Sequence, residues 1–193
     1  MLSETTSEKL ILESARGELA ERGILGLRVA SVARNAHCSI TNIYRYFGDR
    51  DGLLARVLGD MYEEITLRAV ENFMDQIRQR PVITMSDIAK AVPFPTSPAE
   101  IRIQMFRMQI LATAVENDHL RQRLQTISYQ RAILWKECFE EIESKLASGE
   151  TFDRQVFRVM LANYAPFYNE LLGDMKVTKE EFQQFVENKL RSS

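Results

Sequence analysis

Residues 25–56 carry a concentration of positive charge that sets them apart from the chain as a whole. This segment has five arginines and two acidic residues, an excess of three positive charges, whereas the complete chain of 193 residues has a formal net charge of −2. Duplex DNA is a dense polyanion, and a protein that neutralises its phosphates gains binding free energy from the counterions it releases. The charge balance therefore excludes a uniformly basic nucleic-acid coat but favours a local DNA-binding patch.

Within this segment, a short run of residues has side chains that are suited to reading DNA. Thr41, Asn42 and Arg45 can hydrogen-bond base edges, because arginine pairs with guanine and asparagine with adenine. Ile40 can contact a thymine methyl group. Other polar groups of the run could reach phosphate oxygens; they belong to Ser39, Tyr44, Tyr46 and Arg50.

These side chains need a helix that presents them on one face. Apolar residues at helical spacing predict short helices over residues 29–36 and 40–47, with Ser39 as the cap of the second. Ile43 and Phe47, four residues apart, would face the interior and leave the polar side chains outside. Two such helices have the dimensions of a helix-turn-helix. On these residues alone, a solvated amphipathic helix packed in a bundle is an equally good interpretation.

The remainder of the chain is also helical by pattern. Strand-like alternation bounded by turn residues is absent, so we expect an all-α protein. A first helix should begin after Thr5 or Ser7, with a capping box of Thr5 and Glu8, and end at Gly23. Later helices are predicted from about residue 50 to at most residue 81, and then over residues 86–92, 99–116, 120–146, 153–172 and 178–190.

Two domains follow from this arrangement. Residues 1–50 are expected to form a three-helix, helix-turn-helix domain, and residues 51–193 a larger helical domain. The long helix that begins near Arg50 would join them without a flexible linker.

Enzymatic chemistry has little support in the sequence. It contains no G-x-S-x-G, no glycine-rich phosphate loop and no H-E-x-x-H, and it has only two histidines. We therefore expect no enzyme, no metal site and no cofactor. The N-terminus lacks the features of a secretory signal, and no apolar run approaches the roughly 18 residues of a membrane span. A cytoplasmic location is the corresponding expectation.

The run from Ile11 to Val57 resembles the DNA-binding domain of the tetracycline-repressor (TetR) family. The string I-Y-R-Y-F-G-D-R-D-G-L-L, residues 43–54, carries most of that resemblance, together with Ala15 and Gly23. The resemblance implies an N-terminal helix-turn-helix domain and a variable helical domain that binds a small molecule. It also implies dimerisation through the last two helices.

Carried over position by position, the resemblance assigns a role to each residue of the second short helix. Ser39 would cap the helix and touch phosphate, and Arg50 would bind phosphate. The groove-facing positions are those of Ile40, Thr41, Asn42 and Arg45, and the positions that grip the DNA backbone are those of Tyr44 and Tyr46. The chain departs from the family pattern at two positions. His37 replaces a turn glycine, and Arg28 replaces a capping Thr or Ser and could itself contact phosphate.

The resemblance leads to a functional prediction. We expect a ligand-responsive transcriptional regulator, most simply a repressor, that binds a palindromic operator as a homodimer and is released by a small-molecule effector. Two alternatives remain: a helical protein-binding module without DNA binding, and a helical-bundle enzyme.

The C-terminal half should supply the effector pocket and the dimer interface. Large and polar side chains proposed to line the pocket are Arg102, Phe106, Gln109, Tyr129, Trp135, Phe139, Asn163 and Phe167. Apolar residues proposed for the interface are Phe157, Leu161, Tyr164, Tyr168, Phe182, Phe185 and Val186. The alternative for this second set is that both helices complete the core of a single chain.

Overall fold

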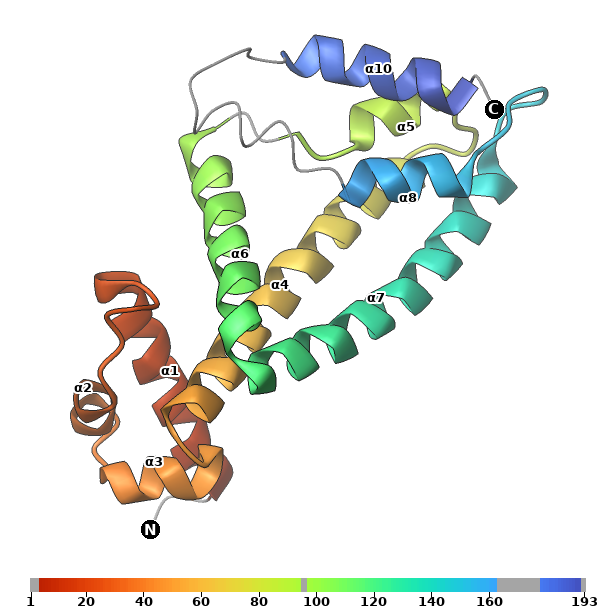
Figure 1. The fold of residues 1–193 in the computed structure, drawn as a ribbon. Helices are drawn as coiled ribbons and strands as arrows, with labels where there is room; N and C mark the ends of the chain where they lie inside the picture. The colour runs from red at the N-terminus through yellow and green to blue at the C-terminus, as the bar shows by residue number, and fades with distance from the viewer. Residues whose placement is uncertain (1–3, 95–96, 163–177, 192–193) are drawn as a thin grey trace. The chain divides into compact units, whose positions relative to one another are not determined.

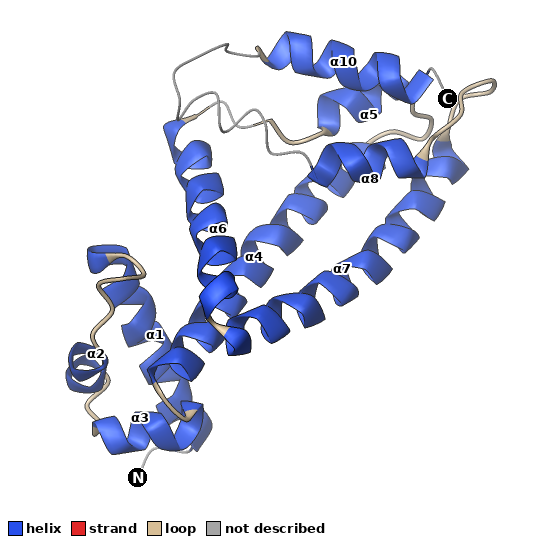
Figure 2. Ribbon diagram, in the orientation of Figure 1, coloured by secondary structure: helices blue, strands red, loops and turns tan. Residues whose placement is uncertain are grey.

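The structure is a computed structural model that describes residues 4–94, 97–162 and 178–191. In these ranges every regular element is a helix, which confirms the all-α prediction (Figures 1 and 2). An isolated parallel bridge between Ile83 and Leu146 is the exception to helical pairing that the structure records. None of the helices described has an apolar stretch long enough to cross a membrane.

The N-terminal helices are α1 (Glu4–Arg22), α2 (Val29–Asn35) and α3 (Ile40–Phe47). Helix α1 ends as predicted, because Gly23 adopts a φ of 69° and its N–H donates to the carbonyl of Leu19 at 2.9 Å. The start of α1 differs from the prediction. The helix begins before Thr5, so the expected capping box of Thr5 and Glu8 is wrong, and the Glu8 carboxylate instead pairs with Arg56 at 2.8 Å.

The later helices follow the predicted spans closely. They are α4 (Arg50–Arg78), α5 (Met85–Ala91), α6 (Pro98–Glu116), α7 (Asp118–Lys145), α8 (Arg154–Ala162) and α10 (Lys179–Arg191). The start of α10 has the features of a capping box: the N–H of Glu181 donates to the hydroxyl of Thr178, and the N–H of Thr178 donates to the Glu181 carboxylate. The part of the predicted helix 153–172 beyond residue 162 lies outside the described residues.

The chain divides into two compact units. The first comprises residues 1–64 and 107–128, and the second comprises residues 65–106 and 129–193. Helices α4, α6 and α7 each contribute residues to both units. The functional boundary predicted at residue 50 is a different kind of division, and it stays a prediction.

The first unit has an aliphatic core beneath the short helices. Val29, Val32 and Ala33 of α2 are buried, as the helical pattern predicted. They share this core with buried residues of α1, α3 and α4, among them Ile11, Leu19, Ile43, Leu53 and Leu58. The hydrophobic effect of this burial holds the two short helices α2 and α3, which would be marginal in isolation.

The second unit has a core rich in aromatic rings. Phe73 of α4 and Phe157 of α8 lie 5.5 Å apart between ring centroids, and Trp135 lies 5.6 Å from each of them. Phe139 and Phe152 extend the cluster. Helix α10 contributes Val186 and Leu190 to the same core, together with Met85 and Ile88 of α5. The last helix thus completes the core of this unit.

Candidate nucleic-acid interface

Helix α3 presents one apolar face to the interior and one polar face to solvent. Ile43 is fully buried, and Phe47 is half-buried behind it. Thr41 and Arg45 are exposed, and Asn42 is half-buried. The predicted orientation of the helix is therefore confirmed, with Asn42 less open than expected. Side chains on such a face can reach the major groove of DNA.

The start of α3 is fixed by a side-chain cap. Ser39 has extended backbone angles, and its hydroxyl oxygen accepts a hydrogen bond from the Asn42 N–H at 3.1 Å. This satisfies one of the backbone donors that a helix N-terminus leaves unpaired. The predicted cap is confirmed. The hydroxyl hydrogen of Ser39 stays available to donate to a phosphate oxygen.

The turn before α3 requires an unusual backbone conformation. His37 has a φ of 52°, the one positive value at a non-glycine residue in the described part of the chain. The conformation lets the Cys38 N–H donate to the Ala33 carbonyl at 2.9 Å, which closes the end of α2. A histidine tolerates this region better than most residues but at some cost. His37, which replaces the turn glycine of the family pattern, thus adopts the positive φ that a glycine would adopt without strain.

Asn42 interacts with a thiol at the turn before α3. Its side chain hydrogen-bonds the Cys38 thiol. Burial raises the pKa of Cys38, and this hydrogen bond offsets part of the rise. The thiol is therefore protonated near neutral pH.

Arg45 is held against its neighbour on α3. Its Nη2 donates to the Tyr46 hydroxyl at 3.3 Å, and its guanidinium carbon lies 5.1 Å from the centre of the Tyr46 ring. Such a cation–π contact restricts the conformations of a long side chain at an exposed site. Ile40 and Tyr44 are also exposed, at 41% and 39%. Together with Thr41, the exposed residues Ile40, Tyr44 and Arg45 form the outer face of the helix.

A tight turn joins α3 to α4 and positions Arg50. Gly48 has a φ of 80°, and the Asp49 carboxylate accepts from the Gly52 N–H at 2.7 Å. A side chain at Gly52 would be impossible here, because its Cβ would lie 1.9 Å from the Phe47 carbonyl oxygen. Arg50 is half-buried and pairs with Asp51 at 3.6 Å.

Helix α2 adds exposed positive charge beside α3. Arg28 occupies the cap position of α2 but makes no side-chain capping hydrogen bond, as its replacement of Thr or Ser predicted. It is exposed, as is Arg34. The predictions missed Arg34 as a site residue, although its place among the five arginines was a usable signal. Contact of any of these residues with DNA stays a prediction.

The residues predicted to line the effector pocket differ widely in their exposure to solvent. Arg102, Gln109 and Tyr129 are exposed, Tyr129 at 71%, and Phe106 is half-buried. Trp135 and Phe139 stack at 5.6 Å within the aromatic cluster, where they fill the core of the second unit. Two further residues lie outside the described ranges: Asn163 and Phe167. The effector pocket stays a prediction.

The predicted interface residues divide in a similar way. Phe157 and Val186 have no exposed surface, because they pack inside the core of a single chain. They therefore have no surface to offer a partner. Phe182 is half-buried against Phe94, and Phe185 is 50% exposed. The remaining three predicted residues have no described side chains: Leu161, Tyr164 and Tyr168.

Comparison of the sequence with known families identifies the N-terminal helices. The profile of the family described as "Bacterial regulatory proteins, tetR family" matches residues 11–57, which span most of α1, all of α2 and α3 and the start of α4. Residues 11–57 thus match the N-terminal domain of the TetR family. Helix α3, the expected recognition helix, lies within the matched residues, and the predicted resemblance of this segment to the family is thereby confirmed.

Solved structures extend the likeness of fold to nearly the whole chain. A protein from Mesorhizobium loti described as a TetR-family transcriptional regulator is 14% identical, with a TM-score of 0.63 over 100% of this chain and 96% of that one. The multidrug binding protein EbrR, solved with imidazole, is 16% identical, with a TM-score of 0.62 over 94% and 93%.

A Rhodococcus sp. protein described in the same way as the Mesorhizobium one is 20% identical, with a TM-score of 0.54 and 96% of each chain covered. At these identities the likeness shows the fold alone. No curated protein matches the sequence. The chain therefore has the fold of a TetR-family transcriptional regulator, with a DNA-binding helix-turn-helix at its N-terminus.

Proposed function

We propose that this protein is a ligand-responsive transcriptional repressor that binds a palindromic operator as a homodimer and is released by a small-molecule effector. The observation that carries the proposal is the orientation of α3, with Ile43 fully buried and Thr41 and Arg45 exposed on the opposite face. Arginine and threonine at such positions can hydrogen-bond base edges in the major groove.

The electrostatics of the helix-turn-helix support the same proposal. Arg28, Arg34 and Arg45 are all exposed, and they lie within the segment that has an excess of three positive charges. A patch of this kind attracts the DNA backbone at moderate salt even though the whole chain is slightly acidic.

Dimerisation and ligand response are supported by the exposed apolar surface of α8 and α10 and by a structurally similar protein. Val159 of α8 is 65% exposed and Phe185 of α10 is 50% exposed, which gives both helices apolar surface for a second copy of the chain. The similar protein EbrR is a multidrug binding protein. An effector would act by binding better to a form of the dimer that DNA binds poorly, and DNA would oppose the effector by the same factor.

The decisive test is DNA binding by α3 variants. Operator duplexes are first selected from random sequences by the wild-type protein. Arg45→Ala should then weaken operator binding by about 1–3 kcal/mol and relax the preference at one base position. Tyr44→Phe should weaken binding to all sequences alike, because a phosphate contact carries no base information. Lys136→Ala, which removes an exposed charge from α7, is the control and should bind as wild type.

Two outcomes would reject the proposal. If the wild-type protein selects no DNA, the chain is better described as a helical protein-binding module. If it selects DNA but both α3 variants bind as wild type, α3 is not the recognition helix. Sedimentation of the protein with and without operator tests the homodimer directly.

A further inference from the structure

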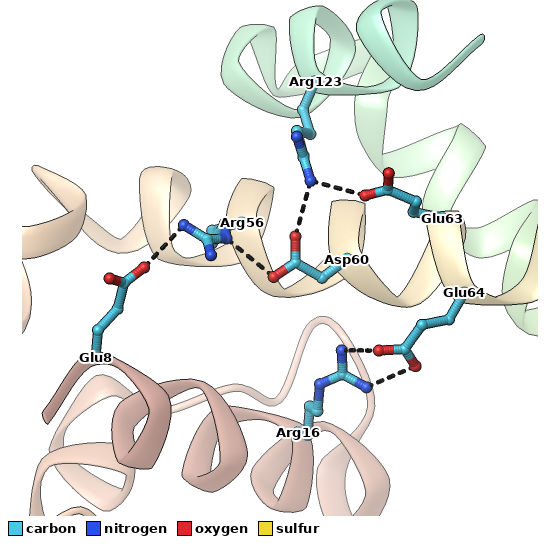
Figure 3. A network of polar contacts seen from close by, with 7 residues as sticks. All are labelled: Glu8, Arg16, Arg56, Asp60, Glu63, Glu64 and Arg123. Carbon is cyan, nitrogen blue, oxygen red and sulfur yellow. Dashed lines mark hydrogen bonds and ion pairs between the residues drawn. The ribbon is translucent and has the colours of Figure 1, made fainter. Parts of the chain in front are cut away.

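Arg123 ties the start of α7 to α4 within the first unit. Its Nη2 donates to Asp60 Oδ1 at 3.0 Å and to Glu63 Oε2 at 2.9 Å, and both carboxylates belong to α4 (Figure 3). The three side chains are only 21–35% exposed. Partial shielding from solvent makes such ion pairs stronger than those on an open surface.

Asp60 is also linked, through Arg56, to α1. Its second oxygen, Oδ2, accepts from Arg56 Nε at 2.9 Å, and Arg56 Nη1 donates to Glu8 Oε1 at 2.8 Å (Figure 3). The side chains therefore alternate in charge from α7 through α4 to α1. We call this chain of Arg123, Asp60, Arg56 and Glu8 the ionic relay.

Close packing holds the same two helices together. Gly59 of α4 is buried, and a Cβ there would lie 2.5 Å from Cγ of Arg123. The Arg123 stem thus lies directly on the α4 backbone. Asn117, only 6% exposed, donates from Nδ2 to the Asp51 carbonyl at 3.1 Å, and its Oδ1 caps α7 by accepting from the Leu120 N–H.

The relay also lies against the end of the recognition helix. A surface hollow of about 300 Å³ is lined by Tyr46 and Phe47 of α3 together with Arg56 and Arg123. A change in the direction of the Arg123 side chain would therefore alter the support of α3 as well as that of α1.

We propose that Arg123 is a positioning residue for DNA binding. This inference rests on the proposed function. It holds α1 and α4 in the arrangement from which α3 meets DNA. Arg123 lies on α7, a continuous helix whose residues beyond 128 belong to the second unit. The relay therefore gives the recognition helix a connection to α7 in addition to its direct chain connection to α4.

The charges around Arg123 argue against a direct contact with phosphate. The two arginines of the cluster, Arg56 and Arg123, face three carboxylates, those of Glu8, Asp60 and Glu63. The cluster thus has an excess of one negative charge. A positioning role and a phosphate contact can be separated experimentally, because losing one phosphate contact lowers the slope of log affinity against log salt by about 0.9.

The test compares Arg123→Gln with the wild-type protein on the operator selected by the wild type. Operator affinity should fall about fivefold, within the range by which positioning residues alter function, with an unchanged salt slope. Amide hydrogen exchange in the first two turns of α1 should become faster, because the relay ends at Glu8. Asp60→Asn should have a similar effect, and the double variant should lose little more than either one.

Arg121→Gln is the matched control. Arg121 lies on the same helix, but it pairs with Asp118 within α7 and donates to the carbonyls of Ala114 and Val115. This variant should bind the operator as wild type and leave exchange in α1 unchanged. Arg123→Lys, which keeps the charge but loses the planar fork, should fall between wild type and Arg123→Gln.

The outcomes separate the inference from the proposed function. If the wild type binds no operator, the proposed function fails, and the positioning role for DNA binding fails with it. If the wild type binds but Arg123→Gln binds equally well, only the positioning role is rejected. A salt slope reduced by about one would identify Arg123 as a phosphate contact and reject the role too. Should Arg123→Gln fail to fold, Arg123→Lys decides by the same two measurements.

Discussion

Within each of the two units, different kinds of contact join the helices. In the first unit, three helices far apart in sequence are joined by ion pairs, among them Arg16 with Glu64 at 2.6 Å and Arg56 with Glu8 at 2.8 Å. In the second unit, ion pairs such as that of Arg78 with Glu141 are joined by a cluster of aromatic contacts, such as those of Phe73 with Trp135 and with Phe157.

Ion pairs and aromatic contacts differ in what they contribute: the first fix the direction of charged groups, and the second stabilise the fold. A unit that meets a polyanion must keep charged groups near its surface, and ion pairs can hold such groups in fixed directions. Ion pairs at the surface contribute little to stability, however, with a median of about 0–1 kcal/mol. The aromatic cluster of the second unit buries much more apolar surface and contributes correspondingly more.

The largest expected effect comes from breaking the aromatic cluster. Phe73→Ala should lower the free energy of unfolding by about 3–5 kcal/mol, because Phe73 is 1% exposed and its removal leaves a cavity between Trp135 and Phe157. Denaturant unfolding followed by tryptophan fluorescence would measure this. Leu67→Ala on the same helix, 37% exposed, should cost much less. Equal losses for both variants would contradict the comparison.

A smaller effect is expected in the turn of the first unit. His37→Gly should raise the free energy of unfolding by about 0.5 kcal/mol, because glycine adopts a φ of 52° without strain but loses more entropy on folding. His37→Ala keeps the Cβ and should not gain. Thermal unfolding of both variants measures the difference, and a glycine variant no more stable than the alanine variant would show that the turn is unstrained.

The smallest effect tests whether ion pairs matter in the second unit. The hydrogen bond from Arg78 lowers the pKa of the Glu141 carboxyl below its ordinary 4.5. The folded state therefore binds this proton less tightly than the unfolded state, so the stabilisation is present above about pH 4.5 and is lost as the pH falls through the lower pKa of the folded state.

Replacing Arg78 with Gln should remove that acid dependence. The variant should lose a few tenths of a kcal/mol at pH 6, since a half-exposed pair is screened by solvent, and nothing at a pH below the folded-state pKa of Glu141. Denaturant unfolding across this range measures the change, with Arg158→Gln on α8 as the control. A loss that stays the same at every pH would mean that Arg78 contributes by packing rather than by charge.

The local structure of the DNA-binding helices could be read from the sequence. Ser39, Ile43 and Gly48 fix the start, the buried face and the end of α3, and each acts on residues no more than four positions away. The same holds for the capping box at Thr178. Such local features can be predicted from the sequence, because helix periodicity and capping depend on residues that are near neighbours in the chain.

Contacts between distant residues were decided by the tertiary structure. Nothing near Arg123 in the sequence indicated that its side chain would bond Asp60 and Glu63. Trp135 and Phe139 were likewise predicted to line a pocket; Phe139 is buried in the core, and the half-buried Trp135 packs against it. An apolar or charged side chain specifies that it needs a partner, whereas only the packing of the helices specifies which one.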